Sequence, residues 1–108
     1  MRVVFHPEFP KDIWRFASDY GRISDGLAAR FRREIDEAVN AIKLSPTSAG
    51  HFLLNQGSAR PKLRRKNLRS FPFFVLYGIV GSHVIIASLI PSRSDPLTWL
   101  SRVAEPDA

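Results

Sequence analysis

The chain has 108 residues, of which 44% are hydrophobic, and it carries 16 Lys and Arg against 10 Asp and Glu, for a net charge of +6. This length suits a single domain spanning residues 1–108. Cysteine is absent, which excludes disulfides and thiolate chemistry. The longest apolar run, Phe71–Val80, is too short to span a bilayer, and the first residues lack the long apolar core of a secretory signal. We therefore expect a soluble, cytoplasmic protein without membrane contact.

The first half of the chain predicts one strand and two helices. Arg2–Phe5 is β-branched and bounded by His6 and Pro7, as a short strand would be. Apolar residues then recur at helical spacing over Pro7–Tyr20, with Gly21 as a plausible terminator. Ser24 and Asp25 can cap a second helix, which Pro46 would end. Two helices joined by so short a connection should form an antiparallel hairpin.

The second helix carries an apolar stripe at spacings of three and four. Its members are Leu27, Phe31, Ile35, Ala38, Val39 and Ile42. The opposite face is expected to hold Arg30, Arg33, Glu34 and Glu37. The stripe should therefore pack on the remaining layer of the domain.

The second half of the chain changes to strand patterns. Residues 47–59 lack periodicity and are expected to be mainly loop. Strands are predicted over Lys62–Leu68, Phe73–Ile79 and His83–Ile90, with Val80–Ser82 as a turn. Short strands joined by short turns indicate an antiparallel meander.

A short closing helix is expected after the last strand, with Asp95 as its cap, Pro96 in its first turn and its end near Val103. The order is then β-α-α-β-β-β-α. A helical hairpin on one face of a mainly antiparallel four-stranded sheet gives a two-layer α+β fold.

Positive charge is concentrated in one segment, and between Glu37 and Asp95 there is no acidic residue at all. The cations of this segment are Arg60, Lys62, Arg64, Arg65, Lys66 and Arg69. Strand alternation predicts that Lys62, Arg64 and Lys66 share a face. Cations at a strand edge can simply prevent aggregation, but two or three would suffice for that. The density favours a surface that grips an anionic or acidic macromolecule.

Other residue types give weaker indications. His6, His51 and His83 are scattered, without the spacing of a metal site, so neither a metal nor another cofactor is expected. The phenylalanines of the run after Arg69 are best explained as core. Tyr77 differs from them, because its hydroxyl needs a hydrogen-bond partner or solvent.

Two motifs resemble the RelE/ParE superfamily of toxins from bacterial toxin–antitoxin systems. The first is Arg69–Tyr77, Arg-Ser-Phe-Pro-Phe-Phe-Val-Leu-Tyr, and the second is Arg93–Arg102, Arg-Ser-Asp-Pro-Leu-Thr-Trp-Leu-Ser-Arg. The resemblance covers nearly the whole chain. Two positions depart from the family pattern: Pro91 stands where a histidine is commonest, and Ser94 replaces a second arginine.

The resemblance implies one of two activities. RelE-like members are ribosome-dependent endoribonucleases that cut mRNA, and the candidate catalytic residues for that activity are Arg64, Arg65, Tyr77 and Arg93. ParE-like members poison DNA gyrase. RNA cleavage needs a base and an acid as well as cations, and no Tyr, His, Lys or Glu follows Arg93 until Glu105. The ParE-like function, which is not enzymatic, is therefore favoured.

Both activities imply a cognate antitoxin as partner, hence a toxin–antitoxin hetero-oligomer and a role in plasmid stabilisation. The binding surface would comprise the six cations of residues 60–69 together with Arg93 and Arg102. Two further hypotheses stay open: an orphan toxin that has lost activity, and a general nucleic-acid binder. With about five phosphate contacts, the latter's log affinity would fall with log salt at a slope of about −4 to −5.

Overall fold

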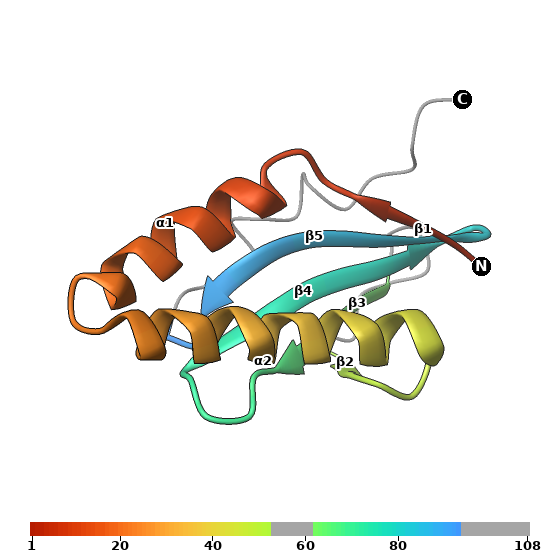
Figure 1. Ribbon diagram of the computed structural model, residues 1–108. Coiled ribbons are helices and arrows are strands. Elements are labelled where there is room, and N and C mark those ends of the chain that lie inside the picture. The colour runs from red at the N-terminus through yellow and green to blue at the C-terminus, as the bar shows by residue number, and fades with distance from the viewer. Residues whose placement is uncertain (53–61, 94–108) are drawn as a thin grey trace.

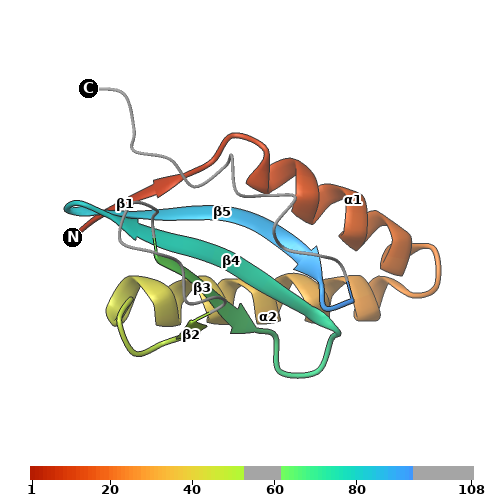
Figure 2. The same ribbon diagram turned by 180° about the vertical axis from the view of Figure 1, so that it is seen from behind.

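The computed structural model describes residues 1–52 and 62–93 as a two-layer α+β fold (Figure 1). Its elements are β1 (Arg2–Phe5), α1 (Phe9–Gly21), α2 (Asp25–Leu44), β2 (His51–Phe52), β3 (Lys62–Asn67), β4 (Phe73–Val80) and β5 (His83–Pro91). Both helices lie on one face of the sheet, and the view from behind shows the sheet in front of α2 (Figure 2). The predicted fold class is confirmed. The expected closing helix, Asp95–Val103, lies outside the described residues.

The helical hairpin forms much as its apolar spacing predicts. The Ser24 side chain caps α2 by accepting a hydrogen bond from the Leu27 N–H at 3.2 Å. Helix α1 begins two residues later than predicted, at Phe9, with Pro10 in its first turn, where no N–H partner is lost. Gly21 is the last helical residue and not a left-handed terminator, since Arg22 follows with a φ of −67°.

The sheet contains one more strand than expected. Its order is β1-β5-β4-β3-β2, with β1 and β5 parallel and the other pairs antiparallel. The added strand β2 falls in the segment expected to be loop, and it pairs His51 with Arg65 and Phe52 with Arg64. The predicted turn between β4 and β5 is confirmed, and Gly81 adopts the positive φ of 59° that favours glycine there.

Apolar clusters lie on both sides of the sheet. The larger one contains Phe73, Val75 and Tyr77 of β4 and packs against the buried stripe of α2. The smaller one contains Phe74 and Leu76, which alternate with them on the other side. The phenylalanines of residues 71–74 are all buried, so their assignment to the core is confirmed.

A buried carboxylate connects α1 to the sheet. Asp12 is buried and accepts a hydrogen bond from the Leu89 N–H at 3.2 Å. Leu89 belongs to β5, which β1 pairs only as far as Ile86. By accepting from the Leu89 N–H beyond that point, Asp12 helps to fix α1 on β5.

Candidate partner-binding surface

The cations of β3 divide between the two faces of the sheet. Arg64 and Lys66 stand opposite Tyr77 and Val75, whose side chains belong to the helix-side cluster. Arg65 stands opposite Leu76, which belongs to the cluster on the other side. The predicted alternation is thus seen for Arg64 and Lys66. Lys62 is the first residue of the strand, but its side chain lies outside the part of the chain that the structure describes.

Arg64 is turned toward the segment that leads into β2. Its Nη1 donates a hydrogen bond to the Gly50 carbonyl at 3.0 Å, and its charge lies close enough to Tyr77 to influence that hydroxyl. A guanidinium that satisfies a backbone carbonyl supports the fold. Arg64 therefore has a structural role in the free protein, whatever else it contacts.

Arg65 is held flat against the far side of the sheet. Its guanidinium carbon lies 4.0 Å from the centre of the Phe74 ring, within cation–π distance. Its Nε and Nη2 both donate to Asn67 Oδ1, at 3.0 and 2.9 Å. These contacts fix the position of the guanidinium against the sheet.

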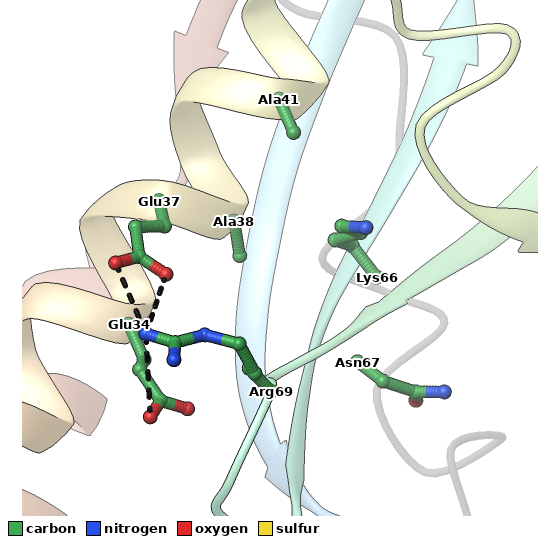
Figure 3. A pocket seen from close by; sticks show the side chains of 7 residues that line it. All are labelled: Glu34, Glu37, Ala38, Ala41, Lys66, Asn67 and Arg69. Carbon is green, nitrogen blue, oxygen red and sulfur yellow. Dashed lines mark hydrogen bonds and ion pairs between the residues drawn. The ribbon is translucent and has the colours of Figure 1, made fainter.

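Lys66 lines a groove of about 350 Å³ between α2 and β3 (Figure 3). The strand side also carries Asn67 and Arg69, and the helix side carries Glu34, Glu37, Ala38 and Ala41. The two alanines keep the helix wall shallow. Within the part of the chain that the structure describes, Lys66 forms no hydrogen bond or ion pair.

Arg69 reaches across this groove to α2. Its Nη2 lies 3.3 Å from the Glu37 carboxylate and 3.9 Å from Glu34 Oε2 (Figure 3). Glu34 Oε1 accepts a hydrogen bond from the Ser70 N–H at 2.7 Å. The two carboxylates therefore hold the β3–β4 connection on the helix. The charge of Arg69 is paired with acidic side chains of the same chain.

Glu34 is buried, with 1% of its surface exposed, contrary to its expected place on the outer face of the helix. It borders the apolar stripe, three residues after Phe31 and four before Ala38, and the connection at Ser70 covers it. Burial alone raises the pKa of Glu34, but the hydrogen bonds from Ser70 and the charges of Arg69 and Arg30 outweigh it. The net result is a pKa below its ordinary value, so Glu34 is ionised at neutral pH.

Tyr77 is enclosed by the fold. Its ring is fully buried, and its hydroxyl donates a hydrogen bond to the Pro46 carbonyl at 2.8 Å. Burial raises the pKa of Tyr77, and the nearby charge of Arg64 offsets this only in part. The hydroxyl is therefore protonated at neutral pH and already occupied, which makes it a poor group for proton transfer to a bound substrate.

The remaining candidates are not gathered around β3. Arg93 is exposed and follows β5, beyond the pairing of Pro91 with Phe73 at the start of β4. Arg64 pairs with Tyr77, which lies four residues after Phe73 in β4. The end of β5 and the position of Arg64 are therefore roughly 13 Å apart along β4. Arg60 and Arg102 lie outside the described residues. No metal-binding group of three or more His, Cys, Asp or Glu occurs in residues 1–52 and 62–93.

Sequence reasoning missed the acidic half of the α2–β3 groove. Glu34 and Glu37 stand close in the sequence to the basic residues of α2 and were expected to face solvent. The available signal was the position of Glu34 at the border of the apolar stripe, which allows burial. Their pairing with Arg69, more than 30 residues away, depends on tertiary structure.

The fold and the basic strand define a small α+β protein with a helical hairpin on one side of its sheet. The same fold occurs in a solved structure described as "Chromosomal ParDE TA system from P. aeruginosa", with a TM-score of 0.67. The two are 15% identical, and the similarity covers 84% of this chain and 95% of that one. This confirms the fold that the motifs implied. No protein-family model and no curated protein matches the chain.

No helix among the described residues is both long and apolar enough to cross a membrane.

Proposed function

We propose that this chain is a ParE-like toxin of a type II toxin–antitoxin system, which inhibits DNA gyrase in the cytoplasm and is neutralised by a cognate antitoxin. The shared fold with a component of a ParDE system supports the toxin class. The observation that favours gyrase over mRNA as the target is the burial and hydrogen bonding of Tyr77. It is the candidate proton-transfer residue of the RelE-like alternative, and its hydroxyl is buried and bonded to the Pro46 carbonyl.

The cations proposed to grip a partner are those that form no ion pair with an acidic residue among the described residues. Lys66 lines the groove on the helix side of β3, Arg65 lies on the opposite face of the same strand, and Arg93 is exposed after β5, so a partner would have to wrap around this side of the sheet to contact all three. An acidic partner surface would neutralise these cations and gain charge-assisted hydrogen bonds. Arg64 and Arg69 contribute chiefly by holding the surface in shape.

The test is inhibition of purified gyrase, measured as supercoiling of relaxed plasmid. The wild-type chain should block supercoiling, whereas Lys66→Glu should do so at least about tenfold more weakly, since a close charge pair becomes repulsive. Arg22→Glu is the matched control, because it makes the same charge change at an exposed position at the far end of α1. It should inhibit like the wild type.

Two results would overturn the proposal. Normal supercoiling at excess chain, together with mRNA cuts mapped by primer extension in arrested cells, would establish the RelE-like alternative. Normal supercoiling with intact mRNA and unimpaired growth would reject a toxin altogether.

A further inference from the structure

Three exposed arginines lie close together on the first half of α2. They are Arg30, Arg32 and Arg33, and we call them the α2 arginine cluster. Arg30 and Arg33 are three residues apart and therefore neighbours on the helix surface, and Arg32 lies further round the helix. The side of α2 opposite its buried stripe faces away from the sheet (Figure 1). The cluster is therefore a surface separate from the cations of β3.

The acids that could neutralise this cluster along the helix are engaged elsewhere. Glu34 follows Arg30 by four residues, but it is buried under the β3–β4 connection. Glu37 follows Arg33 by the same spacing, but it pairs with Arg69 at 3.3 Å. None of the three arginines forms an ion pair with an acid that the structure describes. The fold thus uses the glutamates of α2 to hold the sheet and leaves the arginines uncompensated.

The cluster combines an excess of charge with one pre-positioned member. The Arg30 guanidinium carbon lies 5.2 Å from the centre of the Phe71 ring, within cation–π distance. A guanidinium stacked in this way loses less conformational freedom when it binds a ligand. Asp36 is exposed four residues after Arg32, and the two are not ion-paired. Three positive charges against one negative charge make this face a site for anions.

The surroundings of the cluster favour a nucleic acid over an acidic protein. Protein interfaces depend on apolar or aromatic residues at their centre, and no large apolar side chain is exposed over Asp25–Lys43. Those exposed elsewhere in the described residues are Met1, Phe5, Trp14, Ile23 and Leu44. A phosphodiester backbone is bound chiefly by charge, and guanidinium groups can contact its oxygens bidentately.

We propose that the α2 arginine cluster binds the phosphodiester backbone of double-stranded DNA. Its guanidinium groups contact phosphates and do not read the base sequence. The choice of duplex DNA rests on the proposed function, because gyrase acts on duplex DNA. The cluster belongs to the helical layer, whereas the cations proposed to contact a protein lie in or directly after strands of the sheet.

The test is the anisotropy of a fluorescein-labelled DNA duplex of about 20 base pairs, titrated with the full chain from about 50 to about 300 mM salt. Arg32→Gln/Arg33→Gln removes two exposed cations and keeps good helix formers. Each lost phosphate contact lowers the slope of log affinity against log salt by about 0.9, so the slope should become shallower by about 2. Binding at the low-salt end should weaken at least about tenfold. Adding Arg30→Gln should bring the change in slope to about 3.

Arg2→Gln/Lys43→Gln is the matched control, because it removes the same charge from exposed positions on β1 and in the last turn of α2. Lys43 follows Arg33 by ten residues, which is roughly 15 Å along the helix. The control should keep the slope of the wild type. The single substitutions Arg32→Gln and Arg33→Gln, each expected to change the slope by about 1, decide the question if the double variant fails to fold.

Three results would overturn the proposal. The first is the absence of duplex binding by the wild type at low salt, or equal slopes for the double variant and its control. The second is competition by poly-glutamate that matches unlabelled duplex at equal charge, because the surface would then accept any polyanion. The third is tighter binding of single-stranded RNA than of duplex DNA of the same length.

The outcomes separate this inference from the proposed function. Gyrase inhibition without binding of the free duplex would count against the α2 arginine cluster alone. Duplex binding that responds to Arg32→Gln/Arg33→Gln, in a chain that leaves gyrase active, would count against the gyrase target alone.

Discussion

Gly50 shows how tightly the connection into β2 is packed. A Cβ at this position would lie 2.6 Å from the Arg65 carbonyl oxygen and 2.7 Å from the Tyr77 hydroxyl, closer than real contacts allow. Gly50→Ala should therefore lower the free energy of unfolding by about 1–3 kcal/mol, as overpacking does. Urea denaturation measures this. Gly26→Ala is the control: its Cβ would come no nearer than 3.6 Å to the Ser24 hydroxyl, so it should raise stability by about 0.4–1 kcal/mol. Equal effects would contradict the prediction.

Glu34 makes stability depend on pH. Because its folded-state pKa lies below its ordinary value of 4.5, the unfolded chain binds the proton more readily. The stabilisation is therefore complete above about pH 4.5 and is lost as pH falls through the lower, folded-state pKa. At neutral pH, Glu34→Gln should cost about 1–3 kcal/mol, since a buried charge-assisted hydrogen bond is weakened.

The measurement is the free energy of unfolding from pH 7 to pH 3 for the wild type and Glu34→Gln. The two curves should converge on the acid side. Glu37→Gln is the control, because its half-exposed carboxylate also pairs with Arg69 but should be worth only about 0–1 kcal/mol. A constant gap between wild type and Glu34→Gln at all pH values would show that Glu34 acts by shape and not by charge.

The connection between α2 and β2 is held by two side chains from the sheet. Tyr77 bonds the Pro46 carbonyl and Arg64 bonds the Gly50 carbonyl, so an irregular segment is fixed onto β3 and β4. Tyr77→Phe removes the first bond and should cost about 0.5–1.5 kcal/mol in unfolding experiments. Growth arrest by this variant, at matched expression, should equal that of the wild type. Loss of arrest by a variant folded at the growth temperature would instead assign Tyr77 a chemical role.

Most elements could be predicted because their signals are local. The stripe of α2, the cap at Ser24 and the alternation through β4 each depend on neighbouring residues alone. The predicted start of α1, at Pro7, was two residues too early. The sequence around Pro7 does not determine at which residue the first helical turn begins. Strand β2 escaped prediction since its two residues pair only because β3 offers them an edge.

The candidate surface could be predicted only in part, for a related reason. Charge density identified the segment, and alternation placed Arg64 and Lys66 on one side of β3. Nothing local indicates that Arg69 pairs with Glu34 and Glu37, or that Arg64 is engaged by Gly50. Counting cations therefore overstates how many are available, because intramolecular partners are distant in sequence.

At the scale of the whole molecule, the sheet separates two surfaces of different character. The β3 side offers cations around a groove in which acidic side chains already take part. The β1 side offers an open strand edge and an apolar groove, with Lys43 at its rim. The net charge of +6 surrounds both with a field that attracts acidic partners. The charge would then determine the association rate of a complex, whereas the β1 groove would determine its dissociation rate.

This division predicts how salt affects the binding of an acidic antitoxin. Raising ionic strength from about 50 to about 500 mM shortens the screening length, so the association rate should fall about tenfold or more. The dissociation rate should change much less, because apolar contacts in the groove are not screened. Stopped-flow fluorescence with a candidate antitoxin measures both rates. Phe5→Ala should speed dissociation and leave the salt dependence of association intact, since Phe5 is an uncharged side chain at the mouth of the groove. A dissociation rate that rises with salt as steeply as association falls would contradict this division and place the lasting contacts on the charged β3 surface.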